Sequence, residues 1–193
     1  MQKTSSIVLI NGSMRTESYT KKLLEKIAVK LQAGGARTSL IDVRALQLPV
    51  YDPGMETPEA IVKVSEVLVN ADGIIAGAPE YHGSYSGAIK NLLDYLGSKE
   101  FVNTPIGLVT TTGGLKAGTN TLNHLRLVFR NLHGLVIPQQ FAISQKETTS
   151  DLQLDEEMNN RLENFIQGFE TEVRKKLIFE AWERETRTEP TNK

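Results

Sequence analysis

The sequence predicts an α/β domain in which helices cover both faces of a parallel β-sheet. Three observations predict it. Short apolar runs alternate with helical patterns, these runs are apolar throughout instead of at every second residue, and no repeat or linker divides the chain. Strands buried on both faces need continuous apolar runs, and regular alternation with helices is typical of a parallel sheet. The 193 residues fit one domain, residues 1–193.

Five runs rich in β-branched residues are expected to form the strands. They are Ser6–Asn11, Arg37–Asp42, Gly73–Ala78, Thr104–Thr110 and, less distinctly, Leu135–Ile143. Five parallel strands joined by helices favour a flavodoxin-like three-layer sandwich with strand order 2-1-3-4-5 over a six-stranded dinucleotide-binding sheet.

Helical patterns fill the intervals between these strands. Apolar residues recur at spacings of three and four from Leu23 to Leu31, and Gly34 favours the end of that helix. Similar spacings predict four more helices, over residues 61–71, 88–96 and 122–132 and from about 155 past 169. Residues 184–193 are polar and are expected to form a frayed tail.

Composition excludes several classes of function. The chain has no cysteine, which excludes disulfides, thiolate metal sites, iron–sulfur clusters and cysteine nucleophiles, and no metal site is expected. Its 22 basic and 23 acidic residues are mixed along the chain, so no basic field exists for nucleic acid. No apolar run is long enough to span a membrane, and Asn11 and Gly12 interrupt the N-terminal run too early for a signal peptide. A cytoplasmic protein is expected.

The loop after the first predicted strand has the composition of a phosphate-binding site. Gly12 permits a tight turn, and the following helix start offers free backbone N–H groups to an anion. Hydroxyl donors and one guanidinium follow, at Ser13, Arg15, Thr16 and Ser18. One arginine and a few hydroxyls suit a single terminal phosphate, because the motifs of nucleotide P-loops and dinucleotide turns are missing. The alternative is that Ser18 or Thr16 only caps the helix and that Arg15 is an ordinary surface residue.

Two further loops follow the third and fourth predicted strands. Residues 79–87 contain two glycines and a proline, which give a fixed backbone that can approach a flat ring. Residues 110–114 and Gly118 supply N–H and hydroxyl donors that suit the polar edge of a pyrimidine. Ligands of such sheets bind at the carboxyl ends of the strands. Each loop alone could be an ordinary connection, but together they predict a pocket for a phosphate and a planar heterocycle.

Two segments resemble the motifs of the NADPH-dependent FMN reductase family, which includes quinone, azo-dye and chromate reductases. They are Gly12-Ser13-x-Arg15-x-x-Ser18 and Pro79-Glu80-Tyr81-x-x-Ser84-x-x-Gly87-x-x-Lys90-Asn91-x-x-Asp94. The second motif is the more specific, and the similarity extends to about Phe141. The resemblance implies bound FMN that takes a hydride from NADPH or NADH and passes electrons to a quinone, free flavin, azo compound or similar acceptor. It also implies a homodimer or homotetramer with the active site near the interface.

The resemblance also implies a role for each loop. The FMN phosphate would be held by side chains or backbone N–H groups of Ser13, Arg15, Thr16, Glu17, Ser18 and Tyr19. The isoalloxazine ring would be cradled by Pro79, Glu80, Tyr81, His82, Gly83 and Ser84. Its pyrimidine edge would be bordered by Thr111, Thr112, Gly113 and Gly114. No side chain need act as a catalytic acid or base, because the cofactor carries the chemistry.

His82 stands where the family commonly has asparagine. Its imidazole could face the substrate cavity, or it could pack outward or against a partner subunit. The segment beyond Phe169, including Trp182, has no role that the resemblance assigns.

Two other functions compete with this interpretation. A flavodoxin-type electron carrier would usually be strongly acidic for docking, whereas this chain carries a net charge of −1. A hydrolase with Ser13 as nucleophile would need a histidine–carboxylate pair. His124 and His133 do not stand in such an arrangement and are interpreted as structural or surface residues.

Overall fold

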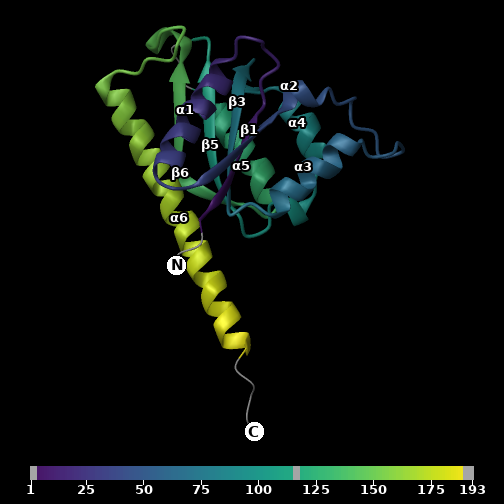
Figure 1. Ribbon diagram of the computed structural model, residues 1–193. Helices are drawn as coiled ribbons and strands as arrows, with labels where there is room; N and C mark the ends of the chain where they lie inside the picture. Colours follow the sequence, from purple (N-terminus) through teal and green to yellow (C-terminus); the bar gives the residue numbers. More distant parts are fainter. Residues whose placement is uncertain (1–3, 115–117, 189–193) are drawn as a thin grey trace.

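Five parallel strands form the central sheet in the order β2-β1-β3-β5-β6 (Figure 1). They are β1 (Ser6–Asn11), β2 (Arg37–Asp42), β3 (Gly73–Tyr81), β5 (Pro105–Thr112) and β6 (Leu135–Ser144). Counted among themselves, these strands have the order 2-1-3-4-5, so the predicted flavodoxin-like topology is confirmed. The computed structural model describes residues 4–114 and 118–188.

Helices cover both faces of this sheet. On one face lie α1 (Tyr19–Ala33) and α6 (Glu156–Thr188). The other face is covered by α3 (Glu59–Val69), α4 (Gly87–Asp94) and α5 (Thr119–Asn131), with the short α2 (Val43–Leu46) beside them. Two short 3₁₀ turns, η1 (Ser98–Glu100) and η2 (Gln145–Glu147), precede β5 and follow β6. Among the helices described, none is long and apolar enough to cross a membrane.

The apolar strand runs are explained by two separate cores. Along β1, Val8 and Ile10 pack with the α3–α4–α5 layer, whereas Ile7 and Leu9 pack with the α1–α6 layer. All four side chains are at most 2% exposed. Successive side chains of a strand point to opposite faces, so burial of both faces requires every position to be apolar.

The sequence did not predict α2 or the two 3₁₀ turns, and β3 runs three residues past its predicted end. Two further differences concern β4 and α6. A two-residue strand, β4 (Ser84–Tyr85), pairs antiparallel with the end of β3, so this loop is a hairpin beside the parallel sheet. The last helix, α6, runs without interruption to Thr188, so residues 184–188 are helical instead of frayed; residues 189–193 lie outside the described part. At 1.5 Å per residue α6 is roughly 50 Å long, and Figure 1 shows it extending beyond the sheet.

Candidate functional site

The three loops singled out in the sequence leave neighbouring strands at one edge of the sheet. β1 and β3 pair up to Asn11 and Gly77, and β3 and β5 pair up to Pro79 and Thr111. The Gly12 N–H donates to the Gly77 carbonyl at 2.8 Å, which joins the first loop to the second strand. Parallel strands end together, so sequence segments almost a hundred residues apart become neighbours here.

The phosphate loop, residues 12–19, is organised by its buried serines. Ser18 is the N-cap of α1, and its hydroxyl accepts a hydrogen bond from the Lys21 N–H at 3.1 Å. The Ser13 hydroxyl accepts from the Arg15 N–H at 3.3 Å. Both serines are at most 2% exposed. Their hydroxyls therefore shape the loop. For Ser18 the structure shows the helix cap of the alternative interpretation, and a contact of Ser18 with a phosphate stays a prediction.

The rest of the phosphate loop faces solvent. Arg15, Thr16 and Glu17 are exposed, and Tyr19 is half-buried at the first turn of α1. The Glu17 carboxylate accepts from Lys22 Nζ at 3.1 Å, so that any contribution of Glu17 to anion binding comes from its backbone. A helix start with an exposed guanidinium beside it fits a phosphate group, because both the helix dipole and the charge favour an anion.

Four polar residues that no sequence motif indicates hold this loop in place through hydrogen bonds. Asn11 Nδ2 donates to Asp42 Oδ1 at 3.0 Å, and Lys21 Nζ donates to Asp42 Oδ2 at 2.9 Å. The hydrogen bond that Lys21 donates to Asp42, and the negative charge of that carboxylate, raise the pKa of Lys21. Arg44 donates to the Met14 carbonyl. Asn11 and Asp42 are the last residues of two predicted strands. This shared position was the feature of the sequence that could have indicated their contact.

The second loop forms a tight hairpin. Glu80 pairs with Tyr85 and Tyr81 with Ser84, leaving His82 and Gly83 as the two turn residues. Both have positive φ, 52° and 77°, which defines a turn of the type I′ class. This turn favours Asn-Gly, which explains why an asparagine suits the His82 position. The His82 side chain is exposed.

Helix α5 anchors the hairpin from one side. The Thr121 hydroxyl donates to Glu80 Oε2 at 2.8 Å, and Ser84 Oγ lies 2.9 Å from His124 Nδ1. The rings of His124 and Tyr85 meet edge to face, 6.4 Å apart. His124 is thus a surface residue, as predicted, but one in contact with the hairpin, and only the fold could reveal that contact.

A serine links the hairpin to the phosphate loop. Ser86 Oγ donates to the Gly12 carbonyl at 2.5 Å and accepts from the Ile89 N–H, which caps α4. A Cβ on Gly12 would lie 2.7 Å from the Ile89 side chain. Glycine is therefore required at position 12 for α4 to pack this close to the loop.

The third loop, residues 110–114, presents backbone groups to a ligand, because its hydroxyl groups are already hydrogen-bonded within the protein. The Thr110 hydroxyl donates to the Ala78 carbonyl, that of Thr111 bonds to Thr20 at 2.7 Å, and that of Thr112 donates to the Gly114 carbonyl. All three threonines are buried, whereas Gly113 and Gly114 are exposed with open space beside them. The expectation of hydroxyl donors at Thr111 and Thr112 is therefore replaced by exposed glycine backbone. Residues 115–117 lie outside the described part.

No group of three or more acidic or histidine side chains in the described ranges, 4–114 and 118–188, could hold a metal ion. The Ser13 hydroxyl, which a hydrolase would need as its nucleophile, is buried and bonded to backbone.

The carboxyl edge of the sheet combines a helix start, a hairpin fixed by its turn and by α5, and an exposed glycine backbone. These features fit a phosphate-bearing planar ligand.

Comparisons with known proteins agree with this geometry. The family model described as NADPH-dependent FMN reductase matches residues 5–148. The NADPH azoreductase of Bacillus sp. (strain OY1-2) is 35% identical over 140 residues, 71% of this chain and 75% of that protein. The FMN-dependent NADPH-azoreductase of Staphylococcus aureus (strain USA300) is 32% identical over 141 residues, 70% of this chain and 74% of that protein.

Solved structures share the fold. The apo form of the NADH:FMN oxidoreductase EMOB superposes with a TM-score of 0.73 and 27% identity, over 86% of this chain and 88% of that one. FerB, an NAD(P)H:acceptor oxidoreductase of Paracoccus denitrificans, gives a TM-score of 0.75 at 20% identity, over 89% of this chain and 98% of that one.

Proposed function

The chain belongs to the NADPH-dependent FMN reductase family, and on this premise we propose that it oxidises NADPH or NADH through bound FMN and passes the electrons to a small acceptor. The observation that carries the proposal is the meeting of the phosphate loop, the hairpin and the glycine loop at one sheet edge. The named relatives are azoreductases, so an azo compound is the first acceptor to test, followed by quinones and free flavins.

The phosphate end of FMN is assigned to residues 13–19. Backbone N–H groups at the start of α1 favour an anion, and the exposed Arg15 side chain would supply a charged donor. Thr16 can add its hydroxyl, while Ser13 and Ser18 hold the loop in shape. Asp42 neutralises Lys21 behind the loop, which leaves Arg15 as the cation we assign to the phosphate.

The ring of FMN is assigned to residues 79–84, with residues 111–114 at its pyrimidine edge. The hairpin backbone is held by its turn and by α5, so it can border a flat ring without reorganising. When bound, FMN supplies the hydride and electron chemistry, and the protein supplies orientation and exclusion of water. We assign no catalytic acid or base to this chain. We place the enzyme in the cytoplasm, as a homodimer or homotetramer.

Absorption spectroscopy of the purified full chain tests the proposal. The protein should be yellow, with one FMN per chain, and anaerobic NADPH should bleach the flavin band. Colourless protein that also fails to bind added FMN in titration calorimetry would contradict the assignment. Bound FMN that neither NADPH nor NADH can reduce would instead indicate an electron carrier.

A further inference from the structure

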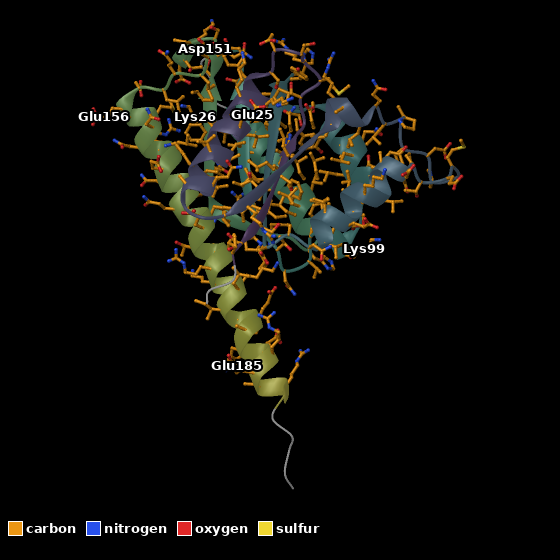
Figure 2. All side chains as sticks on the ribbon, in the orientation of Figure 1. Glu25, Lys26, Lys99, Asp151, Glu156 and Glu185 are labelled. Carbon is orange, nitrogen blue, oxygen red and sulfur yellow. The ribbon has the colours of Figure 1, made fainter. Side chains whose placement is uncertain are left out.

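The second half of α6 presents three large apolar side chains to solvent. Ile178 is 61% exposed, and Phe179 and Trp182 are each 56% exposed. Spacings of three and four place them on one side of the helix, and the Phe179 and Trp182 rings lie 5.7 Å apart. Figures 1 and 2 show this part of α6, up to the labelled Glu185, standing clear of the sheet. We call Ile178, Phe179 and Trp182 the tail face.

The tail face continues into a groove beside the helix. This groove, of about 820 Å³, lies where α6 passes the amino-terminal ends of β5 and β6. Phe179 lines it together with Leu135, Val136 and Pro138. Leu135 is itself 54% exposed. Contiguous exposed apolar surface with a polar rim is typical of a protein interaction site.

The charges along the groove identify the kind of partner. Three basic and three acidic residues line it: Arg130, Lys175, Lys176, Glu172, Glu180 and Glu183. An anionic membrane or a nucleic acid would require an excess of basic residues, and a strongly charged protein would require an excess of the opposite sign. A balanced, apolar surface is instead suited to a copy of itself, because a two-fold interface uses the same patch on both subunits.

We propose that the tail face packs against a second copy of this chain in an antiparallel, two-fold arrangement, with each tail covering the other copy's groove. Lys175, whose side chain is 66% exposed, precedes Phe179 by one turn, and Glu183 follows Trp182 directly. An antiparallel pair brings Lys175 of one copy toward the partner's Glu183, whereas a parallel pair brings like charges together. Within one copy, Lys175 pairs with Glu172 and Glu183 pairs with Arg187. These exposed ion pairs contribute little, so they can give way to pairs between copies.

The area needed explains why the groove must take part. A Phe and a Trp side chain bury about 150–250 Å² each, so those of the tail face, half exposed, offer roughly 200 Å² per copy. A stable interface buries roughly 800 Å² on each partner. Tail against tail alone therefore falls short, and the exposed Leu135 side of the groove supplies further apolar area.

This surface is separate from the candidate flavin site. Residues 178–182 lie beyond the part matched by the family, which ends at residue 148. The groove lies at the amino-terminal ends of the strands, and the three loops lie at their carboxyl ends. Pairing through the tail thus leaves the loops open, and the inference does not rest on the proposed function.

Sedimentation velocity on the full chain tests the inference. The double variant Phe179→Gln/Trp182→Gln keeps good helix formers but removes the aromatic surface. It should sediment with half the wild-type mass at concentrations where the wild type is assembled. Val29→Gln, at a 64% exposed apolar position on α1, is the matched control and should keep the wild-type mass. A double variant that assembles like the wild type, or a control that falls to the same mass, would overturn the inference.

Cross-linking tests the direction of the pair, because the chain contains no cysteine of its own. A Lys175→Cys variant mixed with a Glu183→Cys variant should form a mixed disulfide-linked dimer on mild oxidation. Lys175→Cys alone should form far less. Efficient self-linkage of Lys175→Cys would show a parallel pair and contradict the arrangement. Trp182 is the chain's one tryptophan, so its emission should also shift to shorter wavelength as the pair forms with rising concentration.

Discussion

At the level of single residues, Arg15 is the side chain that distinguishes a phosphate site from an ordinary helix cap. Ser18 caps α1 and would do so without any ligand, whereas the exposed Arg15 guanidinium has no comparable structural task in its loop. If it contacts the FMN phosphate, the charge-assisted hydrogen bond contributes about 1.5–3 kcal/mol.

Arg15→Ala should therefore weaken FMN binding roughly tenfold to a hundredfold and leave riboflavin binding nearly unchanged. Titration calorimetry with both ligands measures the difference. Glu17→Gln is the matched control in the same loop, because the Glu17 carboxylate is directed to Lys22, and it should change FMN affinity far less. Equal weakening of both ligands by Arg15→Ala would remove the phosphate assignment.

The backbone conformation of His82 lowers the stability of the protein, because histidine is not well suited to it. Its φ of 52° lies in the left-handed region, where a side chain costs about 1–2 kcal/mol and asparagine is tolerated best. His82→Asn should raise the free energy of unfolding by up to about 1 kcal/mol, and His82→Val should lower it, as measured by urea denaturation. An unchanged or reduced stability of His82→Asn would mean that the imidazole makes a compensating contact, as expected if it faces a partner subunit. Stopped-flow comparison of flavin reduction and reoxidation in His82→Asn tests the remaining alternative, contact with the acceptor.

At the level of elements, the packing of α6 on α1 places a carboxyl group in a partly dry position. Burial raises the pKa of Glu170, with Arg174 opposing and Glu163 adding to the shift. A carboxyl whose pKa is raised by folding adds stability below the unfolded value of about 4.3, and this stability is lost as pH rises through the folded value.

Glu170→Gln should consequently melt at a higher temperature than the wild type at neutral pH, and the difference should shrink as the pH falls toward 4. Thermal melts from pH 3.5 to 8 measure it. Glu66→Gln, at an exposed position on α3, should show no such pH-dependent gain. A constant difference across the range would assign the effect to packing instead of to protonation.

The sequence predicts some elements far better than others, for physical reasons. The strand β1 is predicted to the residue because both its faces are buried, which forces a continuous apolar run with sharp ends. β4 has two residues and no periodicity to detect. Residues 184–188 are polar and have no apolar periodicity, so the sequence does not indicate that α6 continues through them.

The candidate site shows the same division. Loops at strand ends can be recognised from the sequence, because their glycines and hydroxyl residues interrupt apolar runs. The sequence cannot show which groups of these loops are free to face a ligand. The Thr111 hydroxyl is hydrogen-bonded to Thr20, and His124 of α5 is hydrogen-bonded to Ser84. Both contacts depend on register and packing between segments distant in the chain.

For the whole molecule, one flavin-binding edge has a kinetic consequence. Besides the candidate flavin site, the described residues contain no dinucleotide-binding motif, so NADPH and the acceptor would use the same flavin face in turn. Ping-pong kinetics would result, and double-reciprocal plots at several acceptor concentrations should be parallel. Lines that converge to the left of the axis would show both substrates bound together and would require a second site.

Because the five strands run in one direction, the candidate flavin loops and the tail groove lie at opposite edges of the sheet. Substitutions at one edge can therefore accumulate without affecting the other. Substitutions in the loops at the carboxyl ends can alter which acceptor is reduced without touching α6 beyond Val173. In the proposed arrangement, substitutions in that part of α6 would alter how copies associate without touching the loops. Selection can therefore act on chemistry and on assembly independently, and related chains that share the first 148 residues are free to differ in their C-terminal helix.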